Sequence, residues 1–399
     1  MNKILFGIVG WNIAETTRMI EVAKIFKNDY ECHFFSYGGQ FEHLVTDEGF
    51  ILHNLTPIED DAKIQLLWKI DRGETFKEPW TYDELKERVK NEIALINELK
   101  PAFAFLGSVL TFSLSCNITN TKLFNLIPIS MSRPYLESVQ SINPYLPKYI
   151  NKIICWTALN IPLLMKNFNK IAKEYGLKKR SNLLELWEGD INIVADIKEL
   201  SLLKTLPQNW YYSGALFAHL NTDIPANVLN ILNNSTKKKV YFAMGSSANR
   251  DILLKALSAF QDIDVTVIAP IKSHLKPNDN IPSNVIVTDW LPALEVTKMV
   301  DVAVIHGGQG TVQTTVLAGV PFVGIGMQPE QDMNIYVYKQ FGNALQIRKS
   351  KVSKQSIKTN IEKLLNEKQY KIQAKKAMDI VVNVDTKKII KEIVNNNIT

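Results

Sequence analysis

The chain has 399 residues, of which 46% are hydrophobic and 22% are charged. These fractions are typical of globular proteins, and a chain of this length can bury full-sized cores, which excludes a disordered, collagen-like or disulfide-built protein. At roughly 150 residues per domain, the length indicates two domains. The net charge of +6 is a mild excess, and no aromatic residues interleave with the basic ones, so we do not expect nucleic-acid binding.

The three cysteines, Cys32, Cys116 and Cys155, are far apart and lack CxxC spacing. Neither a zinc site nor a disulfide framework is indicated, and we interpret them as buried thiols of a reducing compartment. The apolar residues that follow Lys3 predict a first strand rather than a signal peptide. No apolar run approaches the length of a membrane span, so we expect a soluble, cytoplasmic protein.

Basic residues cluster in three short stretches, at residues 178–180, 237–239 and 387–388. Such clusters are typical of solvated faces. The alternative is a weak peripheral contact with an anionic membrane.

Short β-branched runs alternate with amphipathic stretches along the chain, which favours parallel sheets covered by helices. In the first half the expected strands are residues 3–9, 30–35 and 102–106, and the expected helices are residues 15–26 and 81–99. Trp68, Trp80 and Trp187 lie in less regular segments.

The second half repeats this rhythm more clearly, and Gly214 marks the expected domain boundary. The expected strands are residues 240–243, 265–269, 285–287, 302–305 and 322–325. The expected helices are residues 251–260, 293–298, 312–317, 331–341 and the tail from 353 to about 394.

A glycine-rich loop, His306-Gly307-Gly308-Gln309-Gly310-Thr311, follows the strand at residues 302–305. Glycines allow close approach of a ligand, and the helix that follows offers free N–H groups and a positive dipole end. The pattern indicates anion binding, most plausibly of a diphosphate. The alternative is a tight strand-to-helix turn whose histidine is satisfied by backbone.

Two neighbouring features strengthen the ligand interpretation. Trp290, in a loop at the same sheet edge, can stack on a nucleobase, although a core tryptophan is the alternative. Glu330 and Gln331, with Asn334 after them, are suited to binding the paired hydroxyls of a sugar. The alternative for these residues is an ordinary acidic first turn of a helix.

The order and spacing of these features resemble the nucleotide-sugar signature of inverting GT-B glycosyltransferases. This superfamily includes the UDP-glycosyltransferases, the macrolide glycosyltransferases and MurG-like enzymes. The matching motifs are W-x-P at 290–292, H-x-G-x-G-T at 306–311, G-V-P at 319–321 and E-Q-x-x-N at 330–334. Looser matches lie at residues 212–216 and 241–246.

The resemblance implies an α/β protein of two Rossmann-like domains whose parallel sheets face each other across a cleft. Residues 1–213 would form the acceptor-binding domain and residues 214–375 the nucleotide-sugar-binding domain. Residues 376–399 would form a helix that crosses back to the first domain.

The resemblance also assigns donor-binding roles. Trp290 would stack on the base, while the Leu291 backbone reads its edge. His306, the glycine loop and Ser246 would hold the diphosphate, and Glu330 with Gln331 would bind the sugar. The loop residues concerned are Gly308, Gln309, Gly310 and Thr311. The resemblance implies no metal and no cofactor besides the nucleotide sugar.

The chain departs from the family pattern at two places. Where many members carry a ribose-binding Glu, this chain has Thr314, preceded by Gln313, so we expect a ribose contact from Gln313 and a weaker preference for UDP over dTDP. The catalytic histidine of the first loop is missing, and alignment places Glu15 at the base position. The Asp that usually orients the base is also missing, near Ser108.

A carboxylate can take the proton of an acceptor hydroxyl, so Glu15 is the expected base. Its alternative is a first-turn residue favoured by the helix dipole. The expected function is inverting transfer from a UDP- or dTDP-sugar to a hydroxyl of a small molecule, lipid or glycan. Two alternatives are an inactive GT-B protein that serves as activator or partner of another transferase, and a UDP-sugar epimerase.

Overall fold

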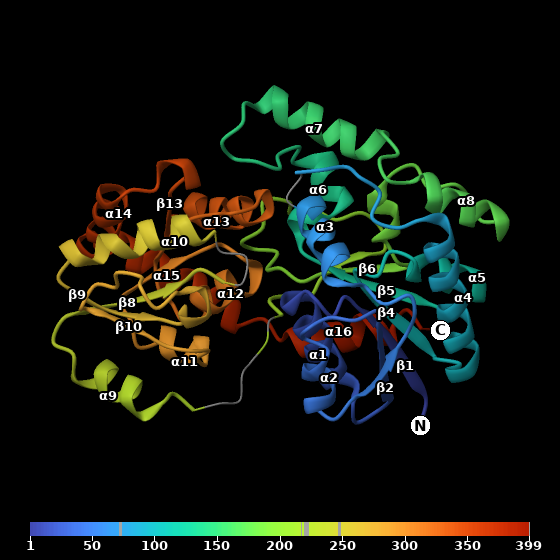
Figure 1. Cartoon of the computed structure of the whole chain (residues 1–399), viewed down its shortest axis with the longest axis horizontal. Helices are drawn as coiled ribbons and strands as arrows, with labels where there is room; N and C mark the ends of the chain where they lie inside the picture. Colours follow the sequence, from blue (N-terminus) through green and yellow to red (C-terminus); the bar gives the residue numbers. More distant parts are fainter. Residues whose placement is uncertain (72–73, 217, 219–222, 246–248, 399) are drawn as a thin grey trace.

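The computed structural model describes residues 1–71, 74–216, 218, 223–245 and 249–398. Its strands form two all-parallel sheets, one from each half of the chain, with the helices packed around them (Figure 1). The predicted α/β class with two Rossmann-like domains is confirmed. Parallel sheets need crossover helices between successive strands, which is why the sequence alternates between the two patterns.

The first sheet has the strand order β3-β2-β1-β4-β5-β6-β7. Its centre is aromatic: the ring centroid of Phe6 lies 4.8 Å from that of Phe34 and 5.2 Å from that of Phe105. Strands buried on both faces favour such continuous apolar runs. The strands are β1 (Lys3–Ile8), β2 (Glu31–Ser36), β3 (Ile51–Asn54), β4 (Phe103–Gly107), β5 (Leu123–Ile127), β6 (Ile191–Val194) and β7 (Trp210–Tyr212).

The helices of the first half begin at recognisable caps. Asn12 accepts the backbone N–H of Ala14 at 3.0 Å before α1, and Thr81 with Glu84 forms a capping box before α4. The helices are α1 (Ile13–Phe26), α2 (His43–Asp47), α3 (Asp61–Asp71), α4 (Tyr82–Leu99), α5 (Phe112–Thr119), α6 (Arg133–Ser138), α7 (Lys148–Asn160) and α8 (Lys166–Glu174), with the 3₁₀ turns η1 (Ile129–Met131) and η2 (Leu183–Leu186).

The second sheet has the strand order β10-β9-β8-β11-β12-β13. Its strands are β8 (Lys238–Ala243), β9 (Val265–Ala269), β10 (Val285–Val287), β11 (Val302–Ile305), β12 (Phe322–Gly324) and β13 (Ala344–Gln346). Its helices are α9 (Ala226–Asn234), α10 (Arg250–Leu257), α11 (Ala293–Thr297), α12 (Gln309–Leu317) and α13 (Pro329–Phe341), with the 3₁₀ turns η3 (Ser258–Asp262), η4 (Lys272–His274) and η5 (Lys349–Lys351).

The tail is three helices: α14 (Lys354–Asn366), α15 (Lys368–Val382) and α16 (Thr386–Asn395). In α15, Ala377 and Val381 are buried in a core of the second half, whereas Ile390 of α16 is buried in the core of the first sheet. Figure 1 shows α16 beside α1. The boundary predicted at residue 376 therefore falls inside α15, and the structure places the crossing after Val382. A division near Gly214 remains our proposal.

Other differences from the prediction are local. The helix expected from residue 312 begins at Gln309, and Trp68 lies within α3 rather than in a loop. Helices α2, α3 and α5 to α9 were not predicted, and most of them are short segments, which give little signal. The three cysteines are buried and free, as predicted. Of the helices in the described parts of the chain, none combines the length and hydropathy that a membrane span requires.

Candidate active site

The glycine-rich loop joins β11 to α12 at the carboxyl edge of the second sheet. Gly308 precedes the first residue of α12, and no side chain caps this helix end. The first backbone N–H groups of a helix have no partner within it, and they carry the positive end of its dipole. Gly307 adopts φ +87°, a conformation that favours glycine. This arrangement suits an anion such as a diphosphate.

His306 is buried between two glycines. Its Nδ1 lies 3.5 Å from the carbonyl oxygen of Ala243, and a Cβ on Gly308 would lie only 2.5 Å from its Nε2. A Cβ on Gly245 would also clash with the ring. Burial lowers the pKa of His306 to about 4, so the imidazole is neutral at pH 7 in the unliganded protein. The α12 N-terminus, rather than His306, therefore supplies the resident positive potential.

The first turn of α13 is tied to the glycine-rich loop. Asn334 Nδ2 donates to the carbonyl oxygen of Gly307 at 3.0 Å and to Oε1 of Glu330 at 2.6 Å. Gln331 is buried, and its Oε1 accepts the backbone N–H of Met327 at 2.9 Å. The half-buried Glu330 thus faces the loop that would hold the diphosphate, which places a carboxylate beside the expected sugar position.

Trp290 and Leu291 follow β10 at the same edge of the sheet, but their side chains differ in exposure. Trp290 is 65% exposed, so the structure does not use its ring as a core residue. Leu291 is buried in the core, which leaves only its backbone for the edge contact that the resemblance implies. Ser246 lies outside the described residues.

Glu15 lies in the first turn of α1, directly after the loop that follows β1. Ser108 Oγ donates to its Oε2 at 3.1 Å, and Arg18 Nη1 pairs with its Oε1 at 2.6 Å. The Glu15 side chain keeps 13% of its surface exposed. Ser108 comes from the segment in which the orienting Asp of the family is missing, so a hydroxyl holds the carboxylate where the family uses a second carboxylate.

Arg18 connects the two domains. Its Nη2 donates to Oε1 of Gln309, the first residue of α12, at 2.8 Å. The same guanidinium thus contacts the candidate base in the first domain and the start of the anion-binding helix in the second. Arg18 is buried, and a buried guanidinium needs such partners.

Gln309 and Gln313 both reach across to the end of β6. Their Nε2 atoms donate to the carbonyl oxygen of Ala195 at 2.9 Å and 2.7 Å. Gln313 is buried by this contact, so its side chain supports the domain interface. The ribose contact expected of Gln313 remains a prediction.

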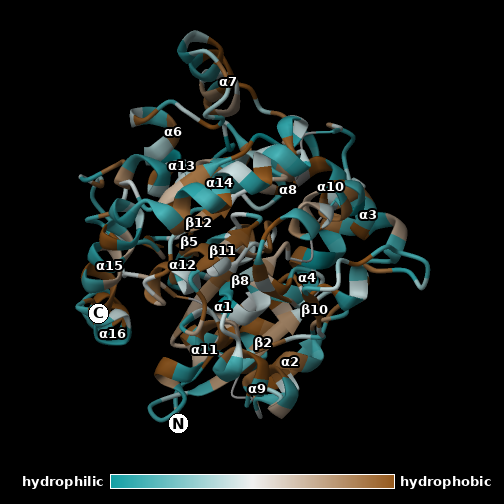
Figure 2. Ribbon diagram, turned by 90° about the vertical axis from the view of Figure 1, so that its left-hand side faces the viewer, coloured by the Kyte–Doolittle hydropathy of each residue, from teal (hydrophilic) through white to brown (hydrophobic). Residues whose placement is uncertain are grey.

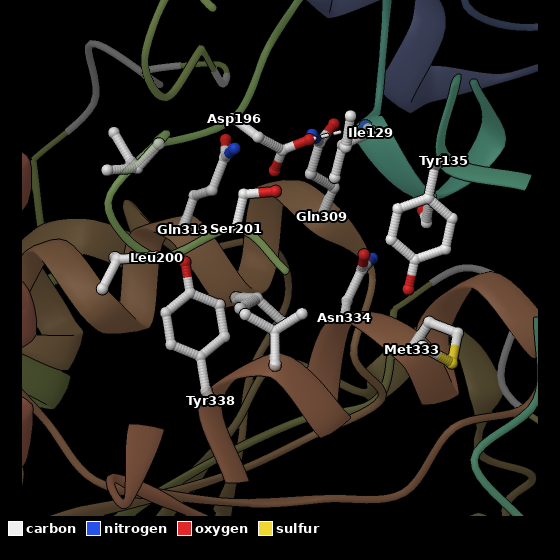
Figure 3. Close-up of a pocket in the computed structure, with 14 residues that line it drawn as sticks. Ile129, Tyr135, Asp196, Leu200, Ser201, Gln309, Gln313, Met333, Asn334 and Tyr338 are labelled. Atoms are coloured by element: carbon white, nitrogen blue, oxygen red, sulfur yellow. Dashed lines mark hydrogen bonds between the residues drawn. The ribbon is translucent and has the colours of Figure 1, made fainter. Parts of the chain in front are cut away.

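Asp196 is the central carboxylate of this interface (Figure 3). Its Oδ2 accepts the backbone N–H of Ile129 at 2.7 Å, and the side chains of Gln309 and Gln313 lie beside it. The side chain keeps partial exposure, but its loss of hydration raises the pKa of Asp196 to about 6. A cavity of about 30 Å³ lies between these groups, Tyr135 and α13, room for about one water molecule.

Sequence reasoning missed Arg18, Ser108 and Asp196 as functional or supporting groups. The sequence did contain a signal for Asp196, because this residue comes two positions after a buried strand and so lies at a carboxyl edge of the sheet. Ser108 had none, because Glu15 is 93 positions away, and the contact of Arg18 with Gln309 spans 291 positions. Within the described residues, no group of three or more His, Cys, Asp and Glu side chains is arranged to hold a metal ion.

Comparison with known proteins shows the family of the chain. Residues 145–382 match the family described as "UDP-glucoronosyl and UDP-glucosyl transferase". The chain belongs to this family. The predicted resemblance is therefore confirmed, and the protein is a nucleotide-sugar-dependent glycosyltransferase.

A distant relative matches along most of the chain. A "PGL/p-HBAD biosynthesis glycosyltransferase" of Mycobacterium tuberculosis (strain ATCC 25177 / H37Ra) is 24% identical over 391 residues, which are 94% of this chain and 87% of the relative.

Two solved structures show the same fold as this glycosyltransferase. The glycosyltransferase VinC in complex with dTDP has a TM-score of 0.71 at 13% identity, over 98% of both chains. The spinosyn rhamnosyltransferase SpnG complexed with spinosyn aglycone has a TM-score of 0.70 at 12% identity, over 99% of this chain and all of the other.

Proposed function

We propose that this glycosyltransferase moves a sugar from a UDP- or dTDP-sugar to an acceptor hydroxyl, with inversion and without a metal ion. The observation that carries the proposal is the double contact of Arg18. It pairs with Glu15 at 2.6 Å and donates to Gln309 at 2.8 Å. The candidate base is therefore held within one side chain's reach of the helix that would bind the departing diphosphate.

In the proposed reaction the acceptor oxygen attacks the anomeric carbon of the donor sugar. The hydroxyl proton passes to Glu15, and the bond between the anomeric carbon and the diphosphate oxygen breaks as the new glycosidic bond forms. The electron pair of the broken bond leaves with the nucleoside diphosphate. Attack opposite to the leaving group inverts the anomeric centre. The α12 N-terminus stabilises the negative charge that develops on the diphosphate, the role that a metal ion plays in other transferases.

The donor assignment rests on the exposed Trp290 ring and on Glu330. Trp290 offers a plane for a pyrimidine base, and Glu330, held by Asn334, offers acceptors for sugar hydroxyls. We place UDP first. We keep dTDP as the second possible donor nucleotide, because the structural neighbour VinC was solved with dTDP and because Thr314 replaces the carboxylate that many family members use on the ribose.

For the acceptor we propose a lipid-like or aromatic hydroxyl compound. Trp11 lies in the loop between β1 and α1, shortly before Glu15. It packs edge-to-face on Trp68 of α3, with ring centroids 5.1 Å apart. Both rings are half-buried, so an apolar surface is offered near the candidate base. The mycobacterial relative, named for PGL/p-HBAD biosynthesis, and SpnG, solved with an aglycone, are consistent with such acceptors.

The test is an assay of nucleoside diphosphate release from a panel of UDP- and dTDP-sugars, with and without phenolic and lipid-like alcohols. The proposal expects release that depends on the acceptor, is unchanged by EDTA and gives a product of inverted anomeric configuration. Release that requires a divalent cation, or a product that retains the donor configuration, would refute the mechanism.

A further inference from the structure

Helix α7 presents an apolar stripe to solvent that the proposed reaction does not use. Tyr149, Ile153 and Trp156, spaced four and three residues apart, lie on one face and are 65%, 58% and 60% exposed. Ile161 and Leu163, directly after the helix, are each 38% exposed. Figure 2 shows α7 projecting from the body of the molecule. Contiguous exposed apolar surface on a globular protein marks an interaction site.

The opposite face of α7 is fixed to the protein. Asn151 is buried, and its Oδ1 accepts the backbone N–H groups of Ile142 and Asn143 at 3.1 Å and 3.0 Å. Cys155, one turn further along, is buried beside α6. The helix is therefore held in a fixed orientation, and the apolar stripe is its outward face.

The charged residues of the segment that carries the stripe are all positive. Between Glu137 and Glu174 the sequence contains five lysines and no aspartate, glutamate or arginine. Lys148 and Lys152 lie on α7 itself, at one edge of the stripe, and both are exposed. Long lysine side chains can reach polar headgroups while neighbouring apolar residues enter the acyl boundary.

We propose that α7 docks this enzyme on the surface of a membrane that contains anionic lipids. Tyrosine and tryptophan favour the boundary between headgroups and acyl chains, and lysines next to them favour negative lipids. With 13 residues, α7 is about 20 Å long, shorter than the roughly 30 Å of a bilayer core, so it would lie in the interface rather than span it.

The charge pattern favours a membrane over a second copy of the chain. A symmetric contact through the stripe would bring Lys148 and Lys152 close to their counterparts, with no acidic residue of this segment to balance them. The position of α7 also suits a surface-bound enzyme. Ser141, in the segment leading to α7, contacts Met333 of α13, so α7 lies where the two domains meet (Figure 1).

Flotation of the full chain with vesicles tests the proposal without donor or acceptor. We expect about fivefold more protein to float with phosphatidylcholine vesicles containing about 30% phosphatidylglycerol than with pure phosphatidylcholine. Salt at about 0.5 M should remove most of this excess. The double variant I153S/W156S should lose binding, and K148A/K152A should weaken binding about tenfold on anionic vesicles.

Two matched variants control for surface changes elsewhere. I372S changes an exposed isoleucine of α15, and K375A/K376A changes two exposed lysines of the same helix. Both should float like the wild type. Equal flotation of wild type and I153S/W156S, or no flotation with anionic vesicles, would overturn the proposal. So would a wild-type dimer in light scattering that I153S/W156S converts to a monomer, since the stripe would then be a protein interface.

Discussion

The Glu15 carboxylate is held from two sides by groups that come from different parts of the first domain. Ser108, after β4, donates to one oxygen, and Arg18, one turn along α1, pairs with the other. Each carboxylate oxygen retains a further lone pair, so Glu15 can still accept the proton of an acceptor hydroxyl. In the proposed mechanism the serine would take the place of the family's second carboxylate, which suits a base that has no tautomers to select.

We expect Glu15→Gln to reduce the rate of sugar transfer by a factor on the order of a hundred or more, because an amide cannot take up the proton. Nucleotide affinity should change little, since the amide oxygen of the variant can still accept a hydrogen bond from Arg18. Single-turnover rates and UDP titrations of the same preparation measure both quantities. Ser108→Ala, which removes only one donor, should lose less. Near-normal turnover of Glu15→Gln would remove it as the base.

Alignment of the first loop with the family pattern predicted Glu15 as the catalytic base. The sequence could not predict which side chains contact its carboxylate. The contact from Ser108 spans 93 positions, and that from Arg18 to Gln309 spans 291. Packing within the first domain decides the first pair, and packing of the two domains decides the second. The expectation of donor contacts for Gln309 and Gln313 came from their place in the motif, whereas their amides support the domain interface.

Helix α12 and the loop before it form the element on which the proposed donor binding depends. The glycines serve two separate purposes: Gly307 allows a backbone turn at φ +87°, and Gly308 leaves room for the His306 ring. The sequence predicted the loop, because three glycines in four positions after an apolar strand are a strong local signal. It placed the start of the helix three residues late, since polar Gln309 and Gly310 do not fit an apolar periodicity.

Substitution of Gly308 by alanine tests the role of the glycine-rich loop in donor binding. A Cβ there would lie 2.5 Å from Nε2 of His306, so the ring must move. The backbone of Gly308, at φ −59°, accepts alanine without strain. We therefore expect roughly tenfold weaker binding of UDP, with little change in the thermal midpoint. Unchanged UDP affinity in a titration would show that the position of the ring does not matter for the donor.

At the scale of the whole molecule, a polar interface joins the two domains and α16 ties the end of the chain to the first. The sequence predicted the two-sheet architecture, because strand and helix patterns are local, whereas the returning helix was expected only from the family resemblance. The interface was not predictable: Asp196, Gln309 and Gln313 meet only after both domains have folded. Its central carboxylate makes the interface sensitive to pH.

The pKa of Asp196 is raised from 3.8 to about 6 in the folded protein, chiefly by loss of hydration. The folded state therefore holds this proton more tightly than the unfolded chain. The stabilisation is fully present below about pH 4 and is lost as the pH rises through about 6. Asp196→Asn lacks this titration, and its amide oxygen can still accept the Ile129 N–H.

We expect the free energy of unfolding of Asp196→Asn, relative to the wild type, to increase by about 1–3 kcal/mol between about pH 4 and pH 7. Urea unfolding at both pH values gives this difference directly. Other titrating groups, including His306, occur in both proteins and cancel. A difference that is independent of pH would show that Asp196 is not protonated in the folded state.

The central claim is that the glycine-rich loop binds the nucleoside diphosphate of the donor. Calorimetric titration of UDP and of dTDP into the wild type and into His306→Ala tests it most directly, with the thermal midpoint of each protein as the control for folding. We expect wild-type binding with a dissociation constant on the order of micromolar, and loss of most of that affinity in His306→Ala. Equal affinity of the two proteins, or no binding of either nucleotide by the wild type, would contradict this assignment of the donor site.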